Sequence, residues 1–76
     1  MPTSDDVAWT LSRVGPRLKR LRAQHGLSLS GLSELTGISK STLSRLEVGQ
    51  RRPSLELLLP IVKTYQVPLD ELIGGS

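Results

Sequence analysis

Hydrophobic residues recur along this chain at intervals of three and four positions, the spacing that places side chains on one face of an α-helix. No segment shows the alternation of apolar and polar residues that is typical of a strand. The pattern therefore predicts an all-α fold, a compact bundle of about five short helices. The residues that we expect to face inward are Val7, Leu11, Val14, Leu18, Leu21, Leu32, Leu35, Leu43, Leu46, Leu55, Leu58, Val62 and Tyr65.

Capping and helix-breaking residues mark the ends of the first predicted helices. Ser4 followed by Asp5 and Asp6 indicates a helix start, because acidic residues in the first turn complement the helix dipole. Pro16 lacks a backbone donor, so either a kink or a fresh helix start is expected there. Gly26 is expected to end the helix that follows.

Similar signals divide the second half of the chain. Ser54 is predicted to cap a fourth helix, and Pro68 to begin a last short helix that runs through Ile73. Pro60 lies inside the fourth predicted helix and removes one of its hydrogen bonds. The sequence leaves this local conflict open.

A tight turn is predicted between the second and third helices. Gly37 follows the second helix, at a position where a helix end favours a residue that tolerates the left-handed conformation. Ser39 can cap the next helix, and Ile38 can pack onto Leu43 across the junction. Two short helices joined by three residues that include a glycine must cross at a large angle. This is the geometry of a helix-turn-helix.

The outward face of the third helix is predicted to carry hydrogen-bond donors and small polar groups. At 100° per residue its polar positions fall within an arc of roughly 140°, opposite Leu43 and Leu46. Such a face fits a DNA major groove, where Arg and Lys can bond guanine, and the helix N-terminus offers free amides to phosphate. The candidate base-reading residues are Lys40, Ser41, Ser44 and Arg45.

Positive charge is concentrated on the segment that contains this turn. The formal net charge of the chain is only +3. From residue 13 to residue 52, however, nine Lys or Arg residues face two Glu, whereas both flanking segments are acidic. A localised basic surface indicates a polyanionic partner. In the first predicted helix, Arg13, Arg17, Lys19 and Arg20 are interpreted as a solvated face with one or two members near phosphate.

The length of 76 residues allows one small domain with one core. We expect an arm or helical extension over residues 1–12, the helix-turn-helix domain over 13–73, and a tail or linker start over 74–76. There is no cysteine, no apolar run long enough to span a membrane and no signal peptide pattern, so a soluble, cytoplasmic and nucleoid-associated protein is expected. His25 is the only histidine and no nucleophile motif stands beside it, so no catalytic residue, metal or cofactor is expected and the protein is predicted not to be an enzyme.

Several motifs in combination resemble the lambda-repressor-like helix-turn-helix domains of the Xre family. They are TGIS, STLSRLE, a glycine followed by a basic loop, PSLELL and DEL, and the resemblance extends over nearly the whole chain. More narrowly, GPRLKRLR together with LSRLEVGQRRPSLELLLP is similar to the N-terminal domain of bacterial regulators that carry a C-terminal cupin domain. This resemblance implies that a cupin sensor domain is absent from this chain.

The resemblance implies roles for further residues. The helix that begins at Ser39 would enter the major groove, with the base-reading residues as above. An arginine of the first helix would pair with the glutamate that ends the recognition helix, here Arg22 with Glu47, as a structural ion pair. The implied phosphate contacts are Ser39, Thr42, Gln50, Arg51 and Arg52.

One position departs from the family pattern. Many members have a glutamine at the start of the second helix, which touches phosphate and braces the recognition helix, but this chain has Leu29. Ser28 or Ser30 could supply a weaker phosphate contact from the same helix end. Gly31 is expected to weaken that helix by roughly 1 kcal/mol relative to alanine.

These observations predict sequence-specific binding of double-stranded DNA by the DNA-binding domain of a bacterial transcriptional regulator, acting as a homodimer on DNA. The rival hypothesis is a protein-interaction module, such as an antitoxin-like adaptor. Trp9 has two interpretations, since it could cap the small core or form an exposed anchor for a second subunit.

Overall fold

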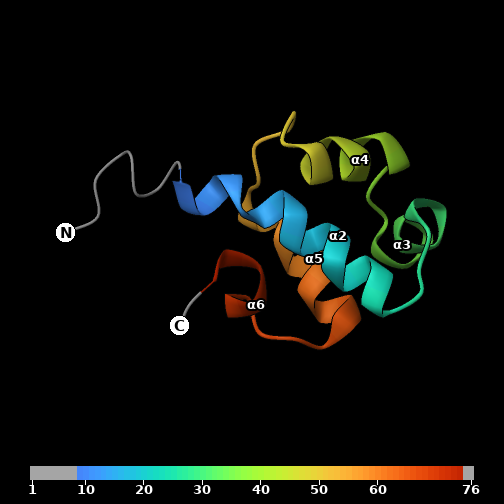
Figure 1. The fold of residues 1–76 in the computed structure, drawn as a ribbon. Coiled ribbons are helices and arrows are strands. Elements are labelled where there is room, and N and C mark those ends of the chain that lie inside the picture. The colour runs from blue at the N-terminus through green and yellow to red at the C-terminus, as the bar shows by residue number, and fades with distance from the viewer. Residues whose placement is uncertain (1–8, 75–76) are drawn as a thin grey trace.

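The computed structural model describes residues 9–74, and every regular element in this range is an α-helix. Residues 9–12 form a helical turn, which Arg13 separates from the next helix. The predicted all-α bundle is confirmed. The helices that follow are α2 (Val14–Gln24), α3 (Leu29–Thr36), α4 (Lys40–Val48), α5 (Leu55–Tyr65) and α6 (Asp70–Ile73) (Figure 1).

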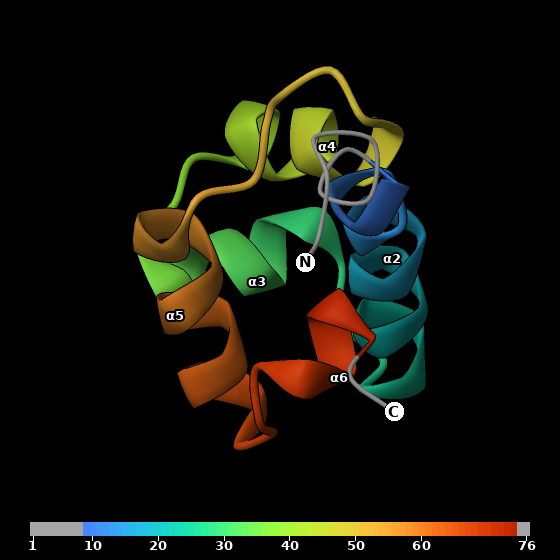
Figure 2. The ribbon, with the colours of Figure 1, turned by 90° about the vertical axis from the view of Figure 1, so that its left-hand side faces the viewer.

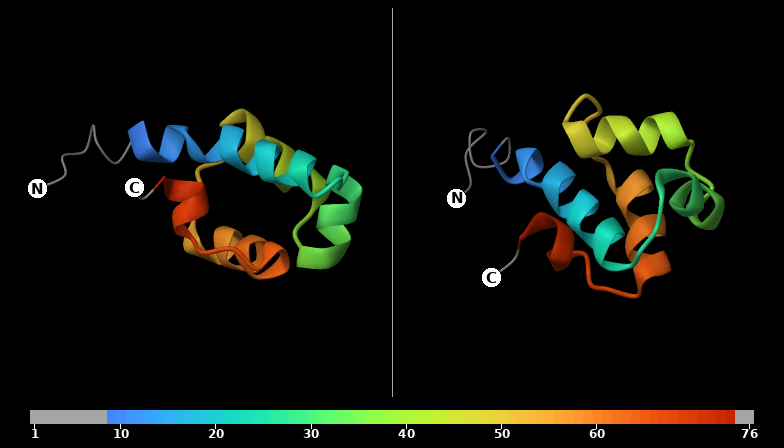
Figure 3. Two further views of the ribbon diagram at one scale, coloured as in Figure 1. Left: turned by 60° about the horizontal axis from the view of Figure 1, so that its bottom comes forward. Right: turned by 45° about the vertical axis from the view of Figure 1, so that its right-hand side comes forward.

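The helices surround one apolar core. Figure 2 shows α2 and α5 on opposite sides of it, with α4 above and α6 below, and Figure 3 shows the same arrangement from two further directions. Val14, Leu18 and Leu21 of α2 are buried in it as predicted, whereas Val7 and the predicted helix start at Ser4 lie outside the described residues. The remaining core residues are Leu32, Leu43, Leu46, Leu58, Ile61, Val62, Tyr65 and Leu72.

Two leucines that were predicted to face inward lie at the surface instead. Leu35 is 60% exposed and Leu55 is 59% exposed. Each lies three positions from a buried leucine, which turns it by about 60° from the centre of the apolar stripe. Each also lies at the end of a short helix, where no neighbouring element covers it. Conversely, Ile61 was left out of the predicted stripe but is completely buried.

Proline and serine residues act differently along the chain. Pro16 lies in the first turn of α2, where its missing donor breaks no helical bond, so the fresh start is the correct alternative. Pro60 lies inside α5, and the helix continues past it while the Thr64 hydroxyl donates to its carbonyl at 2.8 Å. Ser54 is the N-terminal flanking residue of α5 as predicted, but its side chain makes no capping bond. Its backbone carbonyl accepts from Leu57 and Leu58 instead.

The predicted turn between α3 and α4 is confirmed at Gly37 and at the Ser39 cap. Gly37 ends α3 with a left-handed backbone at φ 76°. The Ser39 hydroxyl then accepts a hydrogen bond from the Thr42 amide at 3.2 Å and so caps α4. Ser28 caps α3 in the same manner, accepting from the Gly31 amide at 3.0 Å.

Gly15 allows α2 and α4 to approach backbone to backbone. A methyl group added to it would stand 2.6 Å from the Glu47 carbonyl oxygen and 2.7 Å from that of Leu46. Both oxygens belong to a helix backbone and cannot move independently of α4. Any larger residue at position 15 would therefore push the C-terminal end of α4 away from α2.

An ion pair joins the same two helices nearby. The Arg22 guanidinium donates from Nε to Glu47 Oε2 at 2.7 Å and from a terminal nitrogen to Oε1 at 3.0 Å. It also donates to the Leu27 carbonyl at 3.0 Å, which fastens the connection between α2 and α3. The hydrogen bond to Glu47 raises the already high pKa of Arg22, so the guanidinium stays charged at any pH used for binding studies. Side-chain exposure is 18% for Arg22 and 7% for Glu47, so water screens the pair little.

Tyr65 brings a polar group into the core beside this pair. Its ring lies 4.4 Å from that of His25, whose Nδ1 is 3.0 Å from the Leu21 carbonyl. Within the described part of the chain the Tyr65 hydroxyl has no hydrogen-bond partner. Burial raises the pKa of Tyr65, an effect that the positive charge of Arg22 opposes.

Gly15 and Gly31 provide a matched test, because there is no room for a side chain at Gly15 but there is room at Gly31. Gly15→Ala should lower the free energy of unfolding by about 1 to 3 kcal/mol, because it forces two helix backbones apart. Gly31→Ala should raise it by up to about 1 kcal/mol, because an added methyl group meets only ordinary contacts there and alanine favours the helix. Urea unfolding measures both. Equal effects of the two substitutions would contradict the close approach of α2 and α4.

The ion pair should be sensitive to removal of either partner. Arg22→Ala or Glu47→Ala should each destabilise the domain by about 2 to 3 kcal/mol, because one charge is left without its partner in a largely buried site. The double variant Arg22→Met with Glu47→Leu should be more stable than either single variant, since no unpaired charge remains. Thermal unfolding of all three tests this, and a double variant that is less stable than both single variants would show that an unpaired charge is not the cause of the loss.

The stability of the domain should fall at high pH through Tyr65. The unfolded chain loses the tyrosine proton near pH 10, whereas the folded chain holds it to higher pH. Titration of Tyr65 therefore does not affect the free energy of unfolding below pH 10, and it lowers that free energy as the pH rises above 10. Tyr65→Phe should remove this part of the pH dependence with little loss at neutral pH. The free energy of unfolding at pH 8 and pH 10.5 measures the difference, and identical slopes for both proteins would rule the effect out.

Candidate nucleic-acid interface

The outer surface of α4 lies at the edge of the bundle. The helix packs on α2 and α3 through Leu43 and Leu46, both fully buried. Figures 1 and 2 show that no other described helix lies over its outer side. Lys40, Ser41 and Arg45 are exposed there. Ser44, the fourth predicted base-reading residue, lies between Lys40 and Ser41 around the helix and is half-buried.

The hydroxyl groups at the start of α4 are partly committed to capping. Ser39 accepts from the Thr42 amide and donates its own proton to the Thr42 side-chain oxygen at 2.8 Å. The Ser39 hydroxyl therefore has no proton left for a ligand, whereas the Thr42 hydroxyl keeps its proton. At the start of α3, Ser28 uses an acceptor position for capping and keeps its proton, and Ser30 is exposed.

The loop after α4 is tied to the end of that helix. Gly49 follows the last residue of α4 with a left-handed backbone at φ 81°. The amides of Gln50 and Arg51 both donate to the Arg45 carbonyl, at 2.8 and 3.2 Å. The side chains of Gln50, Arg51 and Arg52 are exposed. The fold thus holds the predicted phosphate contacts of this loop close to the outer surface of α4.

Four cations dominate this part of the molecule, and we call Lys40, Arg45, Arg51 and Arg52 the basic face. The one acidic residue between positions 39 and 52 is Glu47, whose charge is paired with Arg22. The ion pair therefore does more than hold α4 in place. It also removes the negative charge that would otherwise weaken attraction of an anion to the basic face.

The expectation of a purely polar outer face is wrong at Val48. This residue ends α4 and is 66% exposed. At 100° per residue it lies within about 60° of Ser41, Ser44 and Arg45, in the middle of the predicted face. The helical arithmetic that selected the polar residues would have found it if applied through the last residue of the helix.

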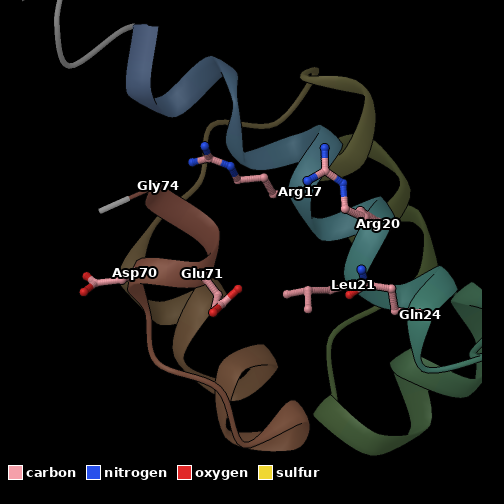
Figure 4. A pocket seen from close by; sticks show the side chains of 7 residues that line it. All are labelled: Arg17, Arg20, Leu21, Gln24, Asp70, Glu71 and Gly74. Carbon is pink, nitrogen blue, oxygen red and sulfur yellow. The ribbon is translucent and has the colours of Figure 1, made fainter. Parts of the chain in front are cut away.

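The cations of α2 are divided between different surroundings. Arg13 lies over the Trp9 ring, 4.7 Å from its centre. Arg17 and Arg20 line an open cleft between α2 and α6, across from Asp70 and Glu71 (Figure 4). The Arg17 guanidinium lies against Gly74, in the space that a side chain at that position would fill. Figure 2 places α6 and α4 at opposite ends of the bundle, so this cleft is separate from the basic face.

Trp9 and His25 both lie at the surface of the domain. Trp9 is 61% exposed, which is incompatible with its capping the core and leaves its surface open to a partner. His25 directly follows the last residue of α2 and is exposed except where its ring meets Tyr65.

Within residues 9–74 no group of His, Cys, Asp or Glu side chains could hold a metal ion. None of the described helices is long and apolar enough to cross a membrane.

Curated proteins with similar sequences are transcriptional regulators by name. The chain is 43% identical over 58 residues to the HTH-type transcriptional regulator AnsR of Bacillus subtilis, covering 76% of this chain and 50% of the relative. It is 41% identical over 57 residues to the HTH-type transcriptional regulator SutR of Escherichia coli, covering 75% of this chain and 32% of the relative. The chain therefore spans half or less of the length of these two relatives.

Solved structures share both fold and sequence with the chain. An HTH_3 family transcriptional regulator from Vibrio cholerae matches with a TM-score of 0.79 at 30% identity, over 87% of this chain and 37% of that one. The restriction-modification controller protein C.AhdI from Aeromonas hydrophila matches with a TM-score of 0.76 at 35% identity, over 82% of this chain and 94% of that one. Residues 18–72, which include α3, the turn and α4, match the family profile described as helix-turn-helix. The chain belongs to the helix-turn-helix family HTH_3.

Proposed function

We propose that this chain is the DNA-binding domain of a transcriptional regulator and binds double-stranded DNA with α4 in the major groove. The observation that carries the proposal is the position of α4, whose inner face is fixed to α2 while its outer face bears Lys40, Ser41 and Arg45 without cover. The named relatives support this function, since they are transcriptional regulators.

Base reading is assigned to the outer side of α4. Arg45 has the longest reach and a planar donor pair that matches guanine O6 and N7 in the major groove. Lys40 can bond the same atoms from the first turn of the helix. Ser41 and Ser44 present short hydroxyl groups, which can donate to or accept from a base edge.

Phosphate contacts are assigned to the two ends of this face. Thr42 can donate its free proton, and Ser28 and Ser30 can do so from the start of α3. Ser39 acts through Thr42, because its own proton is donated to the Thr42 hydroxyl oxygen. In the loop after α4 the proposed contacts are Gln50, Arg51 and Arg52. Contacts of this kind set position and supply affinity in every sequence context.

The regulator is proposed to act as a homodimer. A single small module reads few base pairs, so two copies on half-sites about 34 Å apart would fit successive turns of B-DNA. The sequence resemblance to cupin-type regulators adds the proposal that the full protein carries a C-terminal sensor domain. Regulators that contain this chain would then bind an effector outside the region described.

Exposed apolar side chains favour a second candidate function, an adaptor or antitoxin-like module that holds a protein partner. Trp9, Leu35 and Leu55 each expose more than half of their surface. Salt distinguishes the two functions. Between 50 and 200 mM salt, DNA binding through about six phosphates should weaken by roughly 1,000-fold or more. Binding of a protein through an apolar centre should weaken far less.

Selection from random duplexes followed by sequencing tests the proposed function. We expect a symmetric site with two half-sites, and Arg45→Ala should lose one base preference at a cost of about 1 to 3 kcal/mol. Arg51→Ala should weaken binding to all duplexes similarly and reduce the salt slope by about one. The measurements are affinities for the selected duplex and its single-base variants at several salt concentrations.

Two outcomes would overturn these assignments. If no duplex is enriched, the domain does not read DNA sequence and the adaptor function becomes the better account. If both variants lose affinity with unchanged base preference, the division between base reading and phosphate contact is wrong. Lys63→Ala provides the control, since this exposed cation of α5 lies outside the proposed interface and its loss should leave base preference unchanged.

A further inference from the structure

Val48 is an exposed aliphatic residue among polar ones. It projects from the last turn of α4 with two thirds of its surface open, although the core positions of this helix are filled by Leu43 and Leu46. Valine also has a lower helix propensity than most residues, so its presence contributes nothing obvious to α4. Neither packing nor local structure accounts for this side chain.

The place of Val48 on the helix gives it a specific neighbourhood. It lies about 20° around the helix from Ser41, 40° from Ser44 and 60° from Arg45, all of which belong to the proposed base-reading surface. Along the axis it stands about 4.5 Å beyond Arg45. That displacement is close to the step of about 3.4 Å between successive base pairs. A base pair next to the one contacted by Arg45 is therefore within its range.

The major groove offers one apolar group to such a side chain. Base edges present hydrogen-bond donors and acceptors, with the C5-methyl group of thymine as the exception. Resting on the function proposed above, we propose that Val48 recognises a pyrimidine C5-methyl group beside the base pair read by Arg45. It thereby adds a preference for thymine that the polar residues of α4 do not supply. The same chemistry would accept 5-methylcytosine, which carries an identical methyl group.

Single-atom changes in the DNA test this inference directly. In the selected duplex each thymine is replaced in turn by deoxyuridine, which lacks only the methyl group. Each half-site should contain one sensitive thymine. Replacing that thymine alone should weaken binding of the unaltered protein about fourfold, the effect of withdrawing one methyl group from an apolar contact. Val48→Ala changes both copies of the dimer, so it should bind the original duplex about 16-fold more weakly, the product of two fourfold losses. It should not distinguish thymine from uracil at that position.

Further arms separate the sources of the methyl group and provide controls. Replacing the sensitive T·A pair by C·G should lower affinity, and 5-methylcytosine in place of that cytosine should restore about fourfold. Leu55→Ala removes a comparably exposed aliphatic side chain outside α4 and should keep the full sensitivity to uracil. Because Val48 is at the surface, Val48→Ala should retain the melting temperature of the parent protein.

The outcomes also distinguish this inference from the proposed function. Enrichment of a duplex without sensitivity to uracil at any thymine would overturn the role of Val48 and leave DNA binding intact. Equal sensitivity in the parent protein and Val48→Ala would overturn it as well. If Val48→Ala instead weakens self-association in sedimentation without altering the response to uracil, the side chain belongs to a protein interface. Failure to enrich any duplex would refute the function on which the inference rests.

Discussion

The contact between α2 and α4 governs the geometry of everything that follows in this domain. At Gly15 the two helices approach so closely that only a hydrogen atom fits between the Gly15 Cα atom and the Glu47 carbonyl oxygen. About two turns further along α2, Arg22 donates two hydrogen bonds to the Glu47 side chain. A steric contact and a bidentate ion pair on the same neighbour fix both the separation of the helices and the rotation of α4 about its axis. With that rotation set, the direction of every side chain on α4 is determined.

The same ion pair links structure to electrostatics. Glu47 faces inward and is nearly buried, and its charge is neutralised within the domain. Lys40, Arg45 and the two arginines of the following loop therefore act together on the outer side. The loop adds to this arrangement because its amides bond to the Arg45 carbonyl, so the end of the helix and the basic loop behave as one unit. A surface of this kind attracts an anion, because the one acidic residue of α4 and the following loop is already paired with Arg22.

Exposed apolar side chains are the other notable property of this small domain. A chain of this size cannot cover all of its hydrophobic surface, so isolated exposed leucines need no special explanation. Trp9 and Val48 differ from these leucines in their surroundings. Trp9 stacks with Arg13 beside the first full helix, and Val48 stands in the middle of a polar helix face. What sets Trp9 and Val48 apart is their position beside charged and polar neighbours, more than their hydrophobicity.

Local sequence determined the elements of this fold. Gly37 and Ser39 specify the turn and the cap through interactions within a few residues, and the three- and four-residue spacing of leucines specifies the helices. Tertiary packing decided which side chains are covered. Leu35 and Leu55 have the same spacing as the buried leucines but lie at helix ends that no neighbour reaches, whereas Ile61 is enclosed from several sides. The need for glycine at position 15 and the exposure of Val48 also depend on where a distant helix lies, because periodicity records the phase of a side chain around its own helix and nothing about what stands opposite it.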